Sequence, residues 1–330
     1  MKRLIITYDY ELFFGIKSGT IQKSLIEPTN YILSDLEKYG FRGTFFVDYL
    51  MLKCLKNTED QQAHDDLILI ENQLKEIIKR GHRIELHIHP HWVDAKYNGD
   101  GTWDYTNYSH YSLNSFKEEE IKKMFVEGTL LLNNIAREVA PAYRICAFRA
   151  GGWAVQPFNK LAKAFKAANI KIDSSVAYGA FYKCDYSYYD FRDKTIKDKG
   201  PYWFNDDVLV PLSQGSFLEV PIASFRRYMI YRVFCKLYRM FTNKCNRITD
   251  GTHKRPDLPP FQARKYAMCS LSDTEPISSV FSILSRKTNI VVLMCHPKDY
   301  TFSHKSCLRI LSYFTKSTNY SEVYNNIVNK

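Results

Sequence analysis

The sequence predicts an α/β protein built on a parallel sheet or a (β/α) barrel. Short apolar runs rich in β-branched and aromatic residues alternate with longer amphipathic patterns along most of the 330 residues. Apolar residues make up 45% of the chain, enough to bury a sizeable core and to exclude overall disorder. Polar residues also follow the ends of several predicted strands, as expected where a site lies at the carboxyl ends of parallel strands.

The elements follow one another in a regular order. Strands are expected at 4–8, 43–48, 83–88, 144–148, 170–172, 217–222 and 289–295. Helices are expected at 28–39, 59–80, 116–138, 156–169 and 303–316. Two of them carry terminal signals, because Gly81 follows the second and acidic residues open the third after Ser115.

Two stretches interrupt the alternation. Residues 177–216 are rich in Tyr, Asp and Gly and are expected to form a long loop. Residues 223–266 are basic and aromatic. We expect a single domain over residues 1–330, with the segment at about 223–266 inserted into it.

The first predicted strand ends in two acidic residues, Asp9 and Glu11. Residues two apart along an extended chain point to the same side, so these carboxylates can divide the work of binding a metal and accepting a proton from water. By themselves they could equally be a pair of acids facing a loop.

Three histidines at alternate positions, His87, His89 and His91, stand at the end of the third predicted strand. Neutral imidazole is a common ligand for Zn²⁺ and similar ions. One such histidine would more often be structural, but three together favour a metal site.

Two later strands also end in polar residues. Arg149, followed by Gly151 and Gly152, can hold a carboxylate while the glycines let the backbone approach a ligand. His296 follows the last strong strand, where a histidine suits a general acid near neutral pH. A surface arginine beside a glycine turn and a core histidine are the plainer interpretations.

Taken in order, these segments resemble the polysaccharide deacetylase family, with its NodB-homology domain (carbohydrate esterase family 4). The resemblance covers about residues 4–300 and rests on five segments. They are Thr7-Tyr8-Asp9-Tyr10-Glu11, Gly43-Thr44-Phe45-Phe46-Val47, His87 with His91, Phe148-Arg149-Ala150-Gly151-Gly152, and His296-Pro297. Asp173-Ser174-Ser175 is similar to a further motif of the family, less securely.

The resemblance implies a deformed (β/α)7-type barrel, here with a basic helical insert. It implies removal of an acetyl group from a sugar with the help of a divalent ion, often Zn²⁺. Asp9 would be the general base, and His296 would be the general acid. Arg149 would orient Asp9, and Asp173 would orient His296. His87 and His91 would bind the metal.

Two departures from the family pattern bear on the site. Tyr10 replaces the usual second Asp of the first motif, so Glu11 is expected to supply the carboxylate ligand, and the division of roles between Asp9 and Glu11 stays open. Ile88 replaces a Ser or Thr, and His89 is an additional histidine that could be a substrate contact, lie behind the ligands, or face away.

The insert contains a strongly amphipathic pattern at 226–241. On a helical wheel, apolar side chains share one face, and Arg232, Lys236 and Arg239 fall on the other. The plain interpretation is a helix packed on the barrel with a solvated basic face. The alternative is a surface for an anionic membrane or a lipid-diphosphate-linked glycan.

Charge and cysteine content limit which partners and which cellular compartment are expected. The formal net charge of +11 favours an acidic partner, but the chain contains no nucleic-acid motif, and no nucleic-acid partner is expected. Eight cysteines without a CxxC pair are typical of reduced thiols. The N-terminal apolar run is too short for a signal peptide. We therefore expect a cytoplasmic protein, at most peripheral at the inner face of the membrane.

The expected substrate is an acetylated sugar or glycan of a surface-polysaccharide precursor, as in lipopolysaccharide or capsule biosynthesis. Two other classes stay open. An amidohydrolase-type metal hydrolase would fit the His-x-His motif His87-Ile88-His89. A non-catalytic glycan-binding relative would fit the altered first motif.

Overall fold

The computed structural model describes residues 1–254, 265–272 and 275–329. Its centre is a nine-stranded sheet whose main path contains seven parallel strands. In spatial order these are β14 (Ile290–Cys295), β1 (Lys2–Tyr10), β2 (Gly43–Asp48), β3 (Arg83–Ile88), β6 (Ala147–Ala150), β7 (Ile172–Asp173) and β11 (Phe217–Glu219). Two further strands join it: β10 (Tyr202–Phe204), antiparallel to β11, and β15 (Thr315–Ser317), parallel to the start of β1.

The sheet curls until its two ends approach each other. Ile222, just beyond β11, forms parallel bridges with both Ala177 and Val292. The Ala223 N–H donates to the carbonyl of Val292 at 2.9 Å, so the chain after β11 reaches β14 at the other end of the strand order. The deformed, seven-stranded barrel predicted from the sequence is thereby confirmed.

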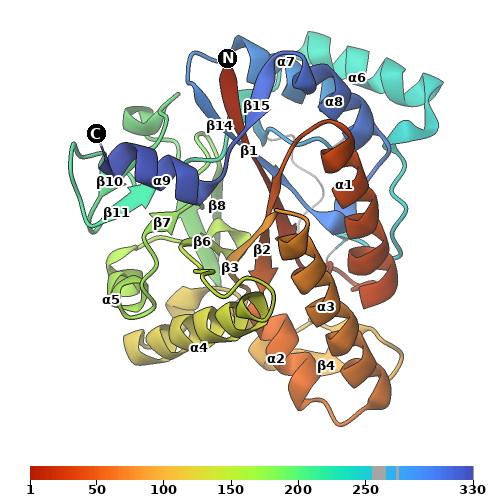
Figure 1. Cartoon of the computed structure of the whole chain (residues 1–330), viewed down its shortest axis with the longest axis vertical. Helices are drawn as coiled ribbons and strands as arrows, with labels where there is room; N and C mark the ends of the chain where they lie inside the picture. The colour runs from red at the N-terminus through yellow and green to blue at the C-terminus, as the bar shows by residue number, and fades with distance from the viewer. Residues whose placement is uncertain (255–264, 273–274, 330) are drawn as a thin grey trace.

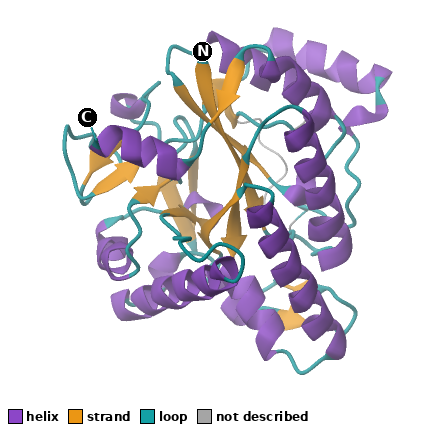
Figure 2. Cartoon of the chain, in the orientation of Figure 1, coloured by secondary structure: helices purple, strands orange, loops and turns teal. Residues whose placement is uncertain are grey.

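Helices surround this curled sheet (Figures 1 and 2). They are α1 (Glu27–Lys38), α2 (Tyr49–Asn57), α3 (Gln61–Lys79), α4 (Glu118–Arg137), α5 (Asn159–Ala167), α6 (Met229–Phe241), α7 (Pro276–Ser285), α8 (Ser303–Ser312) and α9 (Tyr320–Val328). Helix α3 begins where the Asp60 side chain accepts from the Ala63 N–H, and it ends before Gly81, which has φ +79°. Among the residues described, none of the helices has the length and apolar character needed to cross a bilayer.

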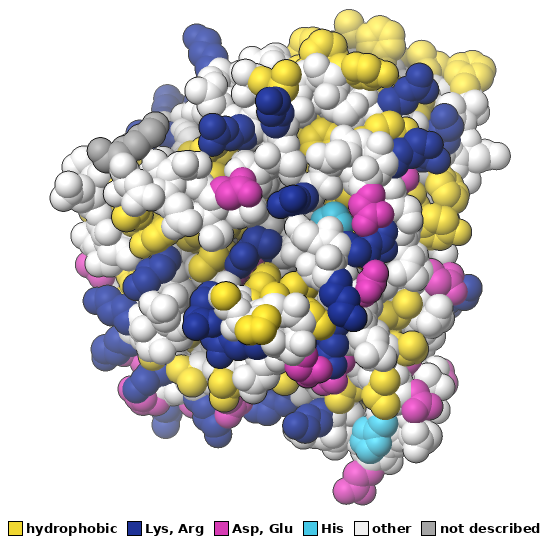
Figure 3. Space-filling model, in the orientation of Figure 1, with side chains coloured by type: hydrophobic (Ala, Val, Ile, Leu, Met, Phe, Trp, Pro, Cys, Tyr) yellow, Lys and Arg dark blue, Asp and Glu magenta, His cyan; other side chains and the backbone are white. Residues whose placement is uncertain are grey.

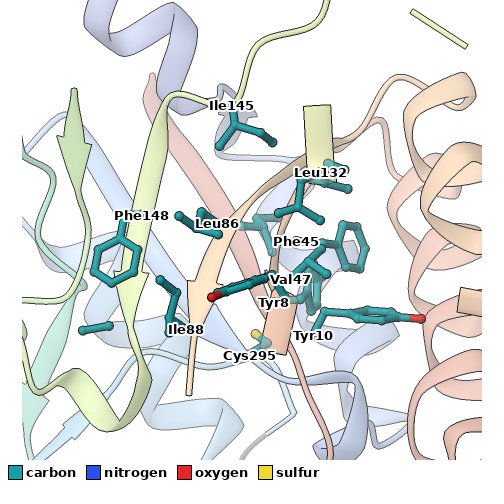
Figure 4. Close-up of a cluster of buried hydrophobic side chains, with 14 of the residues drawn as sticks. Tyr8, Tyr10, Phe45, Val47, Leu86, Ile88, Leu132, Ile145, Phe148 and Cys295 are labelled. Atoms are coloured by element: carbon teal, nitrogen blue, oxygen red, sulfur yellow. The ribbon is translucent and has the colours of Figure 1, made fainter. Parts of the chain in front are cut away.

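The core lies between the sheet and these helices (Figure 4). Every residue of β1 from Leu4 to Tyr10 is buried, as expected for a parallel strand covered on both faces. The rings of Tyr8 and Phe45 stack with centroids 4.9 Å apart, and the Tyr8 hydroxyl lies 2.7 Å from Nε2 of His304. Neighbouring strands and α8 are thus joined through one buried cluster.

The stretch at 177–216 is not a loop throughout, contrary to the prediction. It contains the antiparallel pair β8 (Phe181–Cys184) and β9 (Ser187–Asp190), in addition to β10. Tyr182 and Tyr189 face each other across this pair and stack with centroids 6.0 Å apart. Their aromatic contact stabilises a hairpin whose Asp and Tyr content had favoured a loop.

The insert contains helix α6, as its pattern predicted, and residues 255–264 of the insert lie outside the described part of the chain. Two small strand pairs complete the described fold: β12 (Ser224–Arg226) with β13 (Tyr266–Met268), and β4 (Lys96–Tyr97) with β5 (Trp103–Asp104).

Candidate metal centre

The carboxyl ends of neighbouring strands bring the predicted polar residues together. Asp9 lies in β1 and Glu11 directly follows it, His87 lies in β3, Arg149 lies in β6, and His296 directly follows β14. Four of these five side chains are buried, and His296 is the most open of them, with 19% of its side chain exposed. Parallel pairing thus places the group at one mouth of the barrel.

Glu11 lies at the centre of a compact group of possible metal ligands. Its Oε2 is 2.9 Å from Nε2 of His87 and 2.6 Å from Nε2 of His89. The three ligand atoms all lie within 4.8 Å of one another. Two imidazoles and one carboxylate are a donor set that suits Zn²⁺ and other divalent transition metals.

The hydrogen bonds of His87 favour a cation at this point. Its Nδ1 lies 2.7 Å from the backbone carbonyl of Arg149, which can only accept, so Nδ1 carries the proton. Burial alone would lower the pKa of His87, but the Asp9 and Glu11 carboxylates outweigh it and raise that pKa, so Nε2 carries a proton toward Glu11 in the absence of a metal. A metal ion would take the place of that proton, and a backbone carbonyl behind a ligating histidine is the usual arrangement at metal sites.

His91 is not part of this group, whereas His89 is. His91 lies in the 3₁₀ helix Pro90–Asp94. It is fully buried, and its ring stacks on Tyr111 with centroids 5.3 Å apart. The extended chain continues through His89, and residues two apart in such a chain share a side, so His87 and His89 reach Glu11 together. The structure therefore differs from the ligand set expected from the family resemblance.

Two neighbours fix the position of His89. Its N–H donates to Oδ1 of Asp48 at 3.2 Å, while Oδ2 of Asp48 accepts from Nε1 of Trp92 at 2.6 Å. Burial raises the pKa of Asp48 to about 7. On the other side, a Cβ on Gly151 would lie 2.5 Å from the Ile88 carbonyl oxygen and 2.7 Å from the His89 ring. Only glycine leaves room for the ring at this distance.

Arg149 holds Asp9 in place. Its Nη1 donates to Oδ1 of Asp9 at 2.5 Å and to the Thr7 hydroxyl at 2.8 Å, and its Nε donates to the Ser174 carbonyl at 2.8 Å. The guanidinium also lies over the Phe46 ring, 4.2 Å from the centroid. These contacts position a fully buried arginine beside Asp9.

His296 stands over both carboxylates. Its Nε2 lies 3.8 Å from Oδ2 of Asp9 and 3.6 Å from Oε1 of Glu11. Its Nδ1 faces Oδ2 of Asp299 at 3.2 Å. Burial alone would raise the pKa of Asp299, but His253 and His296 outweigh it and hold that pKa well below its usual range.

The partner that the structure gives to His296 is Asp299, whereas the family resemblance implied Asp173. Asp173 is buried, and its carboxylate accepts from the hydroxyl of Ser175 at 2.8 Å. It also lies beside Glu219, and burial raises the pKa of both carboxyl groups. Asp299 stands in a four-residue segment, His296-Pro297-Lys298-Asp299, whose last two members were not assigned a role from the sequence.

Lys298 is the second residue that sequence reasoning missed. Its side chain is 2% exposed, and Nζ donates to Oε1 of Glu11 and to the carbonyl of Leu12, each at 2.7 Å. Burial alone would raise the pKa of Glu11, but His89, Lys298 and His87 outweigh it and hold it well below its usual range. Since Oε1 is taken by Lys298, Oε2 is the oxygen left for the histidine pair.

The group opens into a cavity of about 360 Å³. Asp9, Glu11, His89, His296 and Lys298 lie on its wall. Its remaining lining is largely aromatic and includes Phe14, Tyr111, Trp153, Tyr182 and Tyr189. Flat aromatic faces with a few polar groups at one end suit a ring-shaped ligand such as a sugar.

Comparison with known proteins identifies the fold by structure alone. No protein-family model matches the chain, and no curated protein matches its sequence. A crystal structure from Mycobacterium smegmatis, of a protein named as a polysaccharide deacetylase, superposes with a TM-score of 0.52. It is 13% identical, and the match covers 99% of this chain and 91% of that one.

Two further solved structures match with lower scores. The catalytic domain of a peptidoglycan N-acetylglucosamine deacetylase from Eubacterium rectale gives a TM-score of 0.36 at 13% identity, over 97% of this chain and 90% of that one. A carbohydrate esterase family 4 pseudoenzyme from Bacillus anthracis gives 0.36 at 11%, over 97% and 64%. The barrel, its strand order and the first of these matches together show that this chain has the polysaccharide deacetylase fold.

Proposed function

We propose that the protein is a metal-dependent deacetylase that removes an acetyl group from an acetamido sugar. The observation that carries the proposal is the placing of Glu11 Oε2 against Nε2 of both His87 and His89, at the wall of an open aromatic cavity. Asp9 and His296 flank the same point and supply a base and an acid.

Glu11, His87 and His89 would hold the metal. A bound divalent ion, most simply Zn²⁺, would polarise the acetyl carbonyl and favour ionisation of a water molecule. Lys298 fixes the Glu11 carboxylate through Oε1 and so presents Oε2. The carbonyl of Arg149 fixes the His87 ring and its tautomer from behind.

Asp9 would accept the proton of the attacking water. Arg149 occupies Oδ1, which leaves Oδ2 on the side of His296. His296 would donate a proton from Nε2 to the leaving amine, while Asp299 accepts from Nδ1 and holds the ring in that orientation. The products are acetate and the free amino sugar.

The substrate class we propose is a precursor of a surface polysaccharide, carried on a lipid diphosphate and met in the cytoplasm. The cavity is lined by aromatic rings that can stack on a sugar, and the net charge of +11 favours an anionic carrier. Lipopolysaccharide and capsule precursors both have this chemistry.

Acetate release from acetamido sugars tests the proposal. Asp9→Asn keeps the shape of the side chain but removes its basicity, so we expect the rate to fall by about 100-fold or more. Asp206→Asn, at an exposed position, is the matched control and should keep the full rate. Full activity in folded Asp9→Asn would contradict the assignment of the base.

A second candidate, a metal hydrolase of amidohydrolase type, is favoured by one observation. The pair that reaches Glu11 is His87 and His89, the His-x-His spacing of that class. Metal analysis separates the two: one ion per chain supports the deacetylase, and two ions support the amidohydrolase type.

A further inference from the structure

Helix α6 carries its apolar side chains on the side that faces away from the protein. We call the following seven residues the apolar stripe: Met229, Ile230, Val233, Phe234, Leu237, Met240 and Phe241. All seven are exposed, with Met229 at 80% and Phe241 at 82%. A surface helix normally buries this face against the core, so the arrangement is the reverse of the usual one.

The opposite side of α6 holds it to the protein. Cys235 is 1% exposed, and its Sγ lies 3.5 Å from the hydroxyl of Ser278 on α7. Tyr238 lies on the same side of the helix and is half-buried. At 100° per residue, these two positions lie away from the centre of the apolar stripe. The plain interpretation, a helix packed on the barrel with a solvated basic face, agrees with the exposed basic side chains, but the side that packs is that of Cys235 and not the apolar stripe.

Basic side chains border the apolar stripe. Arg232, Lys236 and Arg239 recur at helical spacing along one edge, and all three are exposed. The wider segment 226–247 contains seven Lys or Arg residues and neither Asp nor Glu. In Figure 3, yellow side chains gather along the upper right margin, where Figure 1 places α6 and α7, with dark blue ones beside them.

We propose that α6 docks the protein on an anionic membrane surface, lying in the plane of the headgroups with the apolar stripe inserted. Exposed large apolar residues flanked by Lys and Arg are what such helices present to lipid. In a dimer formed through α6, the basic edge of one copy would contact the basic edge of the other. Like charges would then face each other across that contact. Lipid phosphates instead complement the basic edge and leave the acyl boundary for the apolar stripe.

The segment after α6 leads along the chain to the candidate metal centre. The chain that leaves α6 continues to His253, whose Nε2 lies 2.8 Å from Oδ1 of Asp299. Asp299 in turn contacts His296. Docking through α6 would tether the domain that carries the site to a lipid surface, and membrane binding itself does not depend on any enzymatic activity.

Vesicle flotation of the full chain tests the proposal. Vesicles of phosphatidylcholine with phosphatidylglycerol should carry the protein, and vesicles of phosphatidylcholine alone should not. Replacing Arg232, Lys236 and Arg239 by Gln should weaken partitioning by about 100-fold, since each basic residue near an anionic surface contributes about 1 kcal/mol. Raising the salt from about 0.1 to 1 M should also weaken it, because the screening length falls from about 10 to 3 Å.

The apolar contribution has its own variant and controls. Phe234→Ser with Phe241→Ser should lower partitioning by roughly 10- to 100-fold without lowering the melting temperature, since both rings are exposed. Val126→Ser with Leu130→Ser changes two exposed apolar residues on α4 and should leave partitioning unchanged. Lys56, Lys166 and Lys199 changed to Gln are the matched charge control.

Three results would overturn the proposal. One is a folded protein that stays unbound with anionic vesicles, and another is equal binding to both kinds of vesicle. The third is a dimer in sedimentation analysis that Phe234→Ser with Phe241→Ser dissociates, with no vesicle binding by the monomer. That outcome would assign the apolar stripe to a second copy of the chain.

Discussion

Removing the His89 imidazole should abolish tight metal binding, whereas removing that of His91 should not. His89→Ala deletes one of the three atoms that converge at Glu11 Oε2, and His91 lies outside that group. Zinc sites with four protein ligands bind with roughly 10–16 kcal/mol, or about 2.5–4 kcal/mol for each ligand. The affinity for Zn²⁺ should therefore fall by about 100- to 1,000-fold in His89→Ala.

The assay is competition with a fluorescent chelator, followed by metal analysis of the dialysed protein. Circular dichroism and thermal melting show whether each variant is folded, which matters because His91 is fully buried against Tyr111 and Phe14. His91→Ala can lose stability through this packing and should still bind one ion per chain. Loss of metal in folded His91→Ala, with retention in His89→Ala, would refute the geometric argument and restore the ligand pair expected from the family.

Three further changes test the supports of the site and the fold. Gly151→Ala should lower the free energy of unfolding by about 1–3 kcal/mol in urea melts and weaken Zn²⁺ binding. The reason is that the added Cβ would collide with the Ile88 carbonyl and the His89 ring. Unchanged Zn²⁺ binding would contradict this close approach. Arg149→Met should lower the unfolding free energy by about 3–5 kcal/mol, since it leaves the buried Asp9 carboxylate without its ion pair; a loss below about 1 kcal/mol would argue against that pair. Burial lowers the pKa of His82 to about 4, so the unfolded chain takes up the proton first as the pH falls below about 6.5. Stability present at pH 7 should therefore drop by about 2 kcal/mol at pH 5 through this residue, and His82→Gln should remove that part of the pH dependence; an unchanged profile would refute it.

Much of the barrel could be predicted from the sequence because its strands are continuous apolar runs. Residues 43–48 and 83–88 form strands with the predicted bounds, and Asp9, Glu11, His87, Arg149 and His296 do meet at one mouth. Parallel strands buried on both faces leave little ambiguity in such patterns.

The details of the candidate site that could not be predicted from the sequence depend on local geometry. The choice between His89 and His91 turns on where the extended chain ends, and the 3₁₀ helix at Pro90–Asp94 sets that point. Asp299 and Lys298 follow His296 directly, yet their contacts with His296 and Glu11 depend on the turn after β14. Residues two apart in an extended chain point to the same side. This argument, used above for Asp9 and Glu11, would also have favoured His87 with His89 as the metal ligands.

The sequence also could not predict which face of α6 points away from the protein. A helical wheel separates apolar from basic residues, but it does not say which side meets the protein. The contact of Cys235 with Ser278 decides this, because it turns the smaller side of the helix inward.

The place of β1 in the sheet has a consequence for folding during synthesis. Its edge toward β14 pairs Ile5 with Val292, a residue that leaves the ribosome nearly 290 residues later. At about 5–20 residues per second, that edge waits roughly 15–60 s for its partner. An apolar strand with an unpaired edge can pair with other chains in the meantime, so the nascent protein should depend on chaperones that shield such edges until β14 has been synthesised.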